Sequence, residues 1–572
     1  MRDRKKPDKD LMLCCGIFIV YAVLTFIGAA THELWFDEAQ AWDIARDNDI
    51  KGIFRQLGYE GHPPLWYLIL YIPAHIGLSC GVIPYISWFI TGLAGALVLF
   101  RAPFNLITRS ALLFSGGFLY INSVMSRVYC LVNLFIVLIA VLYPQRKKYP
   151  VLYGVLIALL ANTHVFMCGF IGILGIFMLI DLFKDIKGKE TKQIIKELAG
   201  LAIAGIGVLM LVLPLLNSLS LNNSAGEKEL SFLEVLVTFL GSFSETSLFM
   251  LEYGGRYTES AVIAIPEILS AGLLGVMMIV MMILMRHKTR PFLMLLFFWF
   301  FFTITTLVLW LMVPNRALIF AEMFFIAAWI AESEPQNSAR SIWEKGVPKT
   351  DTRLLGKIIG KLALADREYR RVYIVLMTAV LIFSIPTAAV YLFGDYVKPF
   401  CPSEQAAEFV KENLPKDSVF VTNSEDLAQL SAYLPGYEFY ALDYGRFYTY
   451  NSHEVLNEGD EADYGQIYND LKDREHLYFV YVHNSPDYEV VPDGHEEVFI
   501  VRDGMPFGVN VCFWRIVEFT LEPGNNFWFI DDLYKLQSPK NQRQASSKAT
   551  TEHCQHSATS QSSTQFAKAS VV

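Results

Sequence analysis

Apolar segments long enough to cross a lipid bilayer recur along most of this chain, and they constrain its fold more than any other feature. A membrane-spanning helix needs about 20 mostly apolar residues, because the hydrocarbon core is about 30 Å thick. Hydrophobic residues fill 53% of the 572 positions and charged residues only 18%, which is not the balance of a soluble protein of this length. We therefore predict an α-helical polytopic membrane protein with about eleven transmembrane helices, at 11–30, 84–100, 110–125, 129–143, 151–164, 165–183, 198–218, 262–285, 292–312, 314–331 and 373–394.

Basic loops between these segments predict how the chain is oriented. Short loops rich in Lys and Arg stay in the cytoplasm, and the basic loops here are 101–109, 145–148, 184–196, 286–290 and 333–371. All of them lie on one side only if the apolar stretch 64–80, which contains Pro73 and His75, does not cross the bilayer. We expect that stretch to dip into the outer leaflet or to pack among the spans. The prediction is a plasma-membrane protein whose N-terminus, residues 1–10, is cytoplasmic.

The chain changes character after the last predicted span. The transmembrane domain is expected over 11–394, and the residues at 395–537 are expected to form a small extracytoplasmic α/β domain. Acidic residues outnumber basic ones there by roughly three to one, as on a solvated surface. Residues 403–414 have the pattern of a helix, and 418–422, 477–483 and 509–519 have the pattern of strands. The tail 538–572 is rich in Ser, Thr and Gln and is predicted to be disordered.

Two adjacent carboxylates, Asp37 and Glu38, follow the first span in the predicted outer loop 31–83. A carboxylate at the membrane boundary loses part of its hydration, which raises its pKa toward the range useful for a general base. The same residues also fit the start of a helix, because Asp37 followed by Gln40 has the spacing of a capping box. The two roles are compatible, since a cap fixes the direction of the carboxylate.

A histidine and two prolines follow in the same loop, in the sequence Gly61-His62-Pro63-Pro64-Leu65. Proline disfavours helix before it but fits the first turn of a helix, where its missing N–H does no harm. We expect a helix to begin near Pro64 with His62 at its mouth. Such a lone histidine is more often a polar residue of an interfacial turn than a ligand.

Further polar residues fall on the same predicted side of the membrane: Arg127, Tyr129, His164 and Arg316. Ionisable residues at the edge of an apolar bundle are costly unless they face a cavity or a partner, although a single Arg can reach the interface by snorkelling. Arg matches phosphate oxygens with a bidentate fork. Together with the carboxylates and His62, the set suggests a site that holds an anionic head group and removes a proton.

In order and spacing, these motifs resemble the GT-C superfamily of membrane glycosyltransferases, in particular the protein O-mannosyltransferase and aminoarabinose transferase group. The resemblance covers about residues 10–330. It rests on the acidic pair 37–38, His-Pro-Pro-Leu at 62–65, Ser-Arg at 126–127, Thr-His at 163–164 and Arg316. It implies a GT-C type transferase that takes a sugar from a polyprenyl-phosphate donor, with inversion at the anomeric carbon.

The resemblance also implies a role for each matched residue. Asp37 would be the catalytic base that deprotonates the acceptor, and Glu38 would orient the acceptor or tune the pKa of its neighbour. The departing phosphate needs its charge stabilised as it develops. The residues expected to do this are His62, Arg127 and Arg316, supported by Tyr129 and His164.

Cofactors and partners follow from the same reasoning. No acidic residue adjoins Arg127 in the sequence, so the metal site of the oligosaccharyltransferase members has no visible ligands, and we predict no metal and no other cofactor. The eight cysteines contain no CxxC spacing. The expected partners are a polyprenyl-phosphate-sugar donor, a protein, glycan or lipid acceptor, and the lipid bilayer, but no nucleic acid.

Two other functions compete with a transferase. A lipid-linked sugar flippase is the main alternative, although transporters place ionisable residues at mid-membrane and use broken helices in corresponding halves. Here the polar cluster is predicted at one face, and no internal repeat is visible. The second alternative is a binding or scaffolding protein that works through its acidic C-terminal domain.

Overall fold

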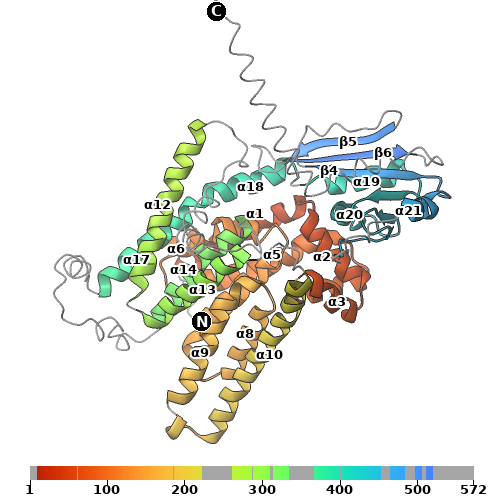
Figure 1. Ribbon diagram of the computed structural model, residues 1–572. Coiled ribbons are helices and arrows are strands. Elements are labelled where there is room, and N and C mark those ends of the chain that lie inside the picture. Colours follow the sequence, from red (N-terminus) through yellow and green to blue (C-terminus); the bar gives the residue numbers. More distant parts are fainter. Residues whose placement is uncertain are drawn as a thin grey trace, which may run out of the picture.

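The computed structural model describes residues 9–60, 62–184, 186–221, 261–286, 288–308, 314–333, 366–399, 401–452, 464–483, 496–504 and 511–519. The predicted disordered tail, 538–572, lies outside these residues. Figure 1 shows a helical body with a sheet at one end, beside α2 (Phe36–Asp47) and α3 (Ile50–Glu60). The structure confirms an α-helical membrane protein with a small C-terminal α/β domain.

The helical body contains long helices joined by shorter ones. The long helices are α1 (Lys9–Thr31), α5 (Ile83–Arg101), α9 (Cys168–Lys184), α10 (Thr191–Leu221), α12 (Ala261–Met285), α13 (Thr289–Val308), α14 (Pro314–Ser333) and α17 (Asp366–Phe383). The shorter helices, besides α2 and α3, are α4 (Leu65–His75), α6 (Leu106–Leu113), α7 (Tyr129–Leu142), α8 (Pro150–Ala161) and α18 (Ile385–Val397). A π-helical turn, η2 (Gly117–Ile121), lies between α6 and α7.

Within the described ranges, five helical segments are long and apolar enough to cross a membrane. They are Lys9–Thr31, Cys80–Arg101, Val165–Lys184, Thr191–Val212 and Tyr369–Val397, and each coincides with a predicted span. The apolar helices Tyr129–Gln145, Pro150–Ala161, Gly272–Met285 and Thr289–Thr305 are shorter in the described part. The number of about eleven crossings and the orientation of the termini stay predictions. Helix α4 has 11 residues and is therefore about 16 Å long, too short to cross by itself.

The predicted span 110–125 is wrong as a continuous helix. Helix α6 ends at Leu113, and the chain resumes in the π-helical turn η2. The backbone passes close to α14 just after the break, because a Cβ atom at Gly117 would come within 2.0 Å of Glu322 Oε1. The backbone at Gly117 approaches the buried carboxyl group of Glu322. The periodicity of apolar residues in the sequence does not reveal such a contact.

In its described residues, the C-terminal domain is a mixed sheet of order β3-β2-β1-β4-β6-β5 with three helices. Strand β1 (Val419–Thr422) runs parallel to both β2 (Glu438–Ala441) and β4 (Leu477–His483). The remaining strands pair antiparallel: β3 (Arg446–Phe447), β5 (Glu496–Gly504) and β6 (Val511–Phe519). The helices are α19 (Ser403–Asn413), α20 (Ser424–Ser431) and α21 (Tyr464–Leu471). One buried apolar cluster continues from the helical body into this domain through Cys401, Val410 and Phe420.

Candidate active site

The start of α2 turns the two neighbouring carboxylates in different directions. Trp35 is the extended N-cap residue, so Asp37 and Glu38 are the second and third helical residues. The carboxylate of Glu38 accepts the backbone N–H of Trp35 at 3.0 Å, as the third residue of a capping box does. The capping role therefore belongs to Glu38 and not, as the sequence suggested, to Asp37 with Gln40.

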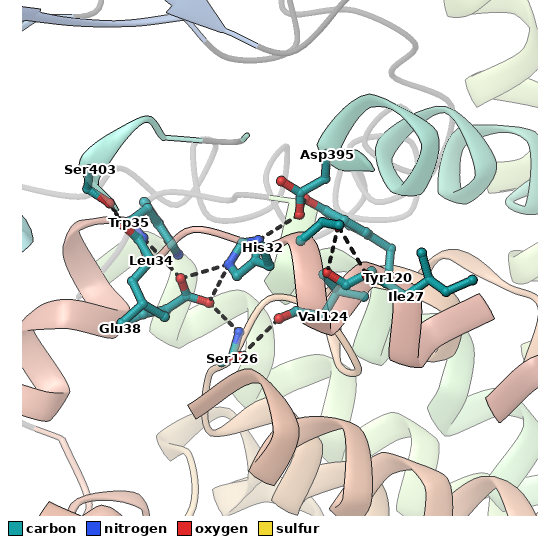
Figure 2. A network of polar contacts seen from close by, with 12 residues as sticks. Ile27, His32, Leu34, Trp35, Glu38, Tyr120, Val124, Ser126, Asp395 and Ser403 are labelled. Atoms are coloured by element: carbon teal, nitrogen blue, oxygen red, sulfur yellow. Dashed lines mark hydrogen bonds and ion pairs between the residues drawn. The ribbon is translucent and has the colours of Figure 1, made fainter. Parts of the chain in front are cut away.

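Glu38 is fully buried in a polar network that Figure 2 shows. Its Oε2 lies 2.9 Å from His32 Nε2, and its Oε1 accepts the backbone N–H of Ser126. The other ring nitrogen of His32 lies 2.6 Å from Asp395 Oδ2 on α18. The Tyr120 hydroxyl donates to the same Asp395 oxygen at 3.1 Å. Because the Glu38 side chain is fully buried, its carboxylate faces no solvent.

His32 carries a positive charge between these two carboxylates. Burial alone would lower the pKa of His32, but the charges of Glu38 and Asp395 and the hydrogen bonds to them outweigh it and hold the pKa well above its usual range. An imidazolium donates from both ring nitrogens, so one ring ties α2 to α18.

Asp37 points instead toward the accessible side, where it forms an ion pair with Arg127. The side chains are 29% and 16% exposed, respectively. The guanidinium carbon of Arg127 lies 5.8 Å from the ring centre of Trp35 and 6.0 Å from that of Tyr129. The structure thus brings together two predicted site residues, a carboxylate and a phosphate-matching cation, at a partly exposed position.

Tyr129 and His164 lie behind Arg127 and are buried. Their rings stack with centroids 5.3 Å apart, and His164 stacks in turn on Phe166 at 4.4 Å. His164 Nδ1 accepts the backbone N–H of Phe166 at 3.3 Å. Tyr129 borders the guanidinium of Arg127 and His164 stacks behind Tyr129, and the supporting role of both residues stays a prediction.

The His-Pro-Pro-Leu motif that contains His62 reaches the segment that bears His164 through Leu65. Helix α4 begins at Leu65, as the two prolines predicted, and the Leu65 N–H donates to the carbonyl of Asn162 at 3.2 Å. His62 Nδ1 lies 3.7 Å from Glu60 Oε2, and the His62 side chain is 24% exposed. The histidine motif and the Thr-His motif therefore meet, although they are about a hundred residues apart in the sequence.

A second polar network connects this loop to the C-terminal domain. Gln40 donates to Glu60 at 2.8 Å and exchanges two hydrogen bonds with the backbone of Asn451, at 2.5 and 2.9 Å. Glu60 also accepts from the Tyr67 hydroxyl at 3.0 Å. Gln40 is one helical turn beyond Asp37, so the loop containing Asn451 is joined to the helix that bears the candidate base.

Several of these residues escaped the sequence analysis. His32, Asp395, Gln40 and Glu60 were not proposed, although His32 and Asp395 lie at the ends of predicted spans. Ionisable residues at the edge of the membrane need partners. This rule applies to His32 and Asp395 as well, and it could have identified them from the sequence. Arg316 is in α14, but its side chain lies outside the described residues, so its role stays a prediction.

Within the described ranges, no group of three or more His, Cys, Asp and Glu side chains is arranged to hold a metal ion. The expectation that the protein needs no metal and no cofactor is not tested by this arrangement.

No protein-family model matches the sequence, and no curated protein matches it. Among solved structures, the chain is similar to the crystal structure of ArnT from Cupriavidus metallidurans bound to undecaprenyl phosphate. The two sequences are 14% identical, and the match covers 87% of this chain and 97% of that chain with a TM-score of 0.43. At this level of identity, the chemistry of the site has to follow from this chain's own side chains.

Proposed function

We propose that this protein is a membrane glycosyltransferase that moves a sugar from a polyprenyl-phosphate-linked donor to an acceptor outside the cytoplasm. The observation that carries the proposal is the partly exposed pair of Asp37 and Arg127 at the start of α2. A carboxylate beside a guanidinium is the minimum set for removing a proton while neutralising a phosphate. The motifs that resemble the GT-C superfamily supply the class of donor.

In the proposed reaction, the acceptor hydroxyl attacks the anomeric carbon of the donor sugar from the face opposite the phosphate. A bond forms between the acceptor oxygen and that carbon, and the bond from the carbon to the phosphate oxygen breaks. The acceptor proton passes to the Asp37 carboxylate, and the electron pair of the broken bond leaves with the polyprenyl phosphate. Attack from the opposite face inverts the anomeric carbon.

Arg127 is proposed to stabilise the leaving phosphate, because a guanidinium fork can donate to two phosphate oxygens at once. Trp35 and Tyr129 border its guanidinium and restrict where that fork points. His62 is partly exposed on the same loop and is proposed as a further phosphate contact. The lipid tail of the donor would lie in the bilayer between helices, which suits a site at the end of α1.

The test is donor turnover by purified protein in nanodiscs, with a panel of polyprenyl-phosphate sugars. Asp37→Asn is expected to reduce release of free polyprenyl phosphate by at least roughly 100-fold, the range attributed to a general base, while the protein still inserts and folds. Asp47→Asn is the matched control, because Asp47 is on the same helix, pairs with Arg46 and has the same 29% exposure. Full turnover by Asp37→Asn would remove Asp37 as the base.

A lipid-linked sugar flippase is the second candidate, and one observation favours it. Glu322 is a buried ionisable residue within α14, about 12 Å along the helix from Pro314, and it adjoins the broken segment around η2. Transporters use such features. Carrier movement across a vesicle bilayer, with no turnover of any donor, would replace the transferase by the flippase.

A further inference from the structure

Glu38 binds both backbone segments that bear the Asp37–Arg127 pair. It is the next residue after Asp37 in α2, and its Oε1 accepts the N–H of Ser126, the residue before Arg127. Its Oε2 closes the first turn of α2 through the Trp35 N–H. The separation of the two backbones, and hence the geometry of the ion pair, therefore depends on one buried carboxylate.

His32 fixes that carboxylate to a distant part of the chain. Its ring connects Glu38 to Asp395 near the end of α18, and His32 and Asp395 are 363 residues apart in the sequence. Asp395 lies shortly before the C-terminal domain, which binds the same segment directly. The Leu34 carbonyl accepts from Ser403 Oγ at 2.5 Å, and the Leu34 N–H donates to the Tyr433 hydroxyl at 2.8 Å. Figure 2 shows Ser403 and Asp395 on opposite sides of the Leu34–Glu38 segment.

We propose that His32 is a positioning residue through which α18 and the C-terminal domain control the geometry of the Asp37–Arg127 pair. The proposal rests on the proposed function and adds a means of regulating its site. Movement of α18 or of the domain that follows it would be transmitted to Glu38, and from Glu38 to both members of the pair. His32 touches no reacting atom, since its side chain is fully buried.

The charge of His32 is what makes the link sensitive to pH. The groups facing its ring are Glu38 from α2 and Asp395 from α18, and Tyr120 from η2 donates to Asp395. A neutral imidazole donates from one nitrogen only, so deprotonation would release one of the two carboxylates. Because the pKa of His32 is raised, the link holds at neutral pH and is lost only on the alkaline side.

The experiment compares wild type, His32→Gln, His32→Lys and Asp395→Asn, with His476→Gln as the matched control in the C-terminal domain. The kinetic readout is kcat and donor KM against pH, using whichever donor the panel identifies. His32→Gln and Asp395→Asn are expected to lower kcat roughly 100-fold, as for a small misplacement of reacting groups, with donor KM changed less than about twofold. His32→Lys keeps a positive charge between the two carboxylates and is expected to retain more of the wild-type kcat at neutral pH than His32→Gln. Wild-type kcat in both His32→Gln and Asp395→Asn, or a change in KM alone, would overturn the proposal.

A second readout does not require turnover. The backbone amides of Trp35 and Ser126 donate to Glu38, so hydrogen exchange in peptides covering 33–40 and 122–128 reports the link. Asp395→Asn is expected to raise exchange in both peptides, whereas His476→Gln is expected to leave them unchanged. If wild type turns over no donor, the proposed function fails, and exchange still decides whether α18 is coupled to the pair. Unchanged hydrogen exchange in Asp395→Asn would contradict the coupling between α18 and the pair. Asp395→Asn therefore tests the coupling even if His32→Gln fails to fold.

Discussion

Asp37 and Glu38 are chemically similar neighbours, and their environments in the fold are opposite. Successive residues of a helix point about 100° apart, because a turn takes 3.6 residues. Asp37 therefore meets Arg127 at a partly exposed position, and Glu38 meets His32, Ser126 and Trp35 in the interior. The sequence identifies both carboxylates but does not tell which one faces out, since that depends on where α2 begins and what covers it.

Arg127→Lys tests whether the guanidinium group of Arg127 binds the donor phosphate through two nitrogens. Lysine keeps the charge but offers a point charge in place of a planar bidentate donor, so donor KM is expected to rise roughly tenfold. The measurement is steady-state turnover with the donor identified by the panel. Arg474→Lys is the control, because Arg474 holds the carboxylate of Glu438 through both terminal nitrogens, at 2.5 and 3.2 Å. Equal KM values in wild type and Arg127→Lys would mean that Arg127 does not bind the phosphate.

At the scale of elements, the contact between η2, α7 and α14 depends on one carboxyl group. Glu322 Oε1 accepts from the side-chain amides of Asn122 at 3.0 Å and Asn133 at 3.2 Å. The apolar pattern predicted one span through η2, and it could not show that Gly117 meets Glu322 there, because the two residues are about 200 positions apart. No local rule joins these residues, and a single sequence cannot reveal the pairing.

Glu322→Leu is expected to destabilise the protein by about 2–4 kcal/mol, because two buried amide groups would lose their acceptor. Glu322→Gln keeps a carbonyl oxygen in place and is expected to cost much less. Thermal unfolding in detergent measures both. Glu332→Leu on the same helix is the control, since it removes only a surface pair with Arg370, which is worth about 0–1 kcal/mol. Equal losses for Glu322→Leu and Glu322→Gln would show that the charge, not the acceptor, holds the contact.

Gly117→Ala tests the close approach of η2 to Glu322 by changing the residue on η2. The new Cβ would lie 2.0 Å from Glu322 Oε1, so the Glu322 carboxyl group must move away from Asn122 and Asn133, or the π-helical turn or α14 must shift, at a cost of about 1–3 kcal/mol. Gly92→Ala on α5 is the control, because nothing lies within 4 Å of a Cβ atom there and alanine favours helix. A Gly117→Ala protein that unfolds at the same temperature as Gly92→Ala would contradict this close contact.

For the whole molecule, the contacts between the helical body and the C-terminal domain are the main feature that the sequence did not predict. The strands at 418–422, 477–483 and 509–519 and the helix at 403–414 were predicted, because their buried faces have clear patterns. Strand β3 has only two residues, and β5 was not recognised. The hydrogen bonds from α2 to Ser431 and Asn451 span about 400 residues, a distance over which one sequence carries no pairing signal.

Glu33 gives this junction a measurable pH dependence. It accepts the backbone N–H groups of Glu404 at 2.8 Å and Gln405 at 3.3 Å at the start of α19. Burial raises the pKa of Glu33 from 4.5 to about 7, against the lowering effect of these hydrogen bonds. The folded state therefore holds this proton more tightly, so the contribution of Glu33 to stability is present below pH 4.5 and is lost as the pH rises to about 7.

The measurement is the difference in unfolding temperature between wild type and Glu33→Gln from pH 4 to pH 8. The unfolding temperature of the wild type is expected to fall relative to that of the variant across that interval. Above about pH 7 the difference between the two is expected to stay constant. Taking the difference removes the contribution of other buried acids of the junction, such as Asp43. A constant difference over the interval would mean that Glu33 titrates normally.

The burial of Glu38 has a consequence for anyone mapping this protein by mutation. A loss-of-activity screen would score substitutions at 37 and 38 alike, and an alignment of inactive variants would present an acidic dyad. On the proposed function, the two failures would have unrelated origins: one variant would lack the group that meets the acceptor, and the other would have lost the alignment of a group it still possesses. Only the loss of activity at position 38 could be restored by a compensating substitution elsewhere. Selection for suppressor mutations would therefore distinguish positions 37 and 38, which a screen for inactive variants does not.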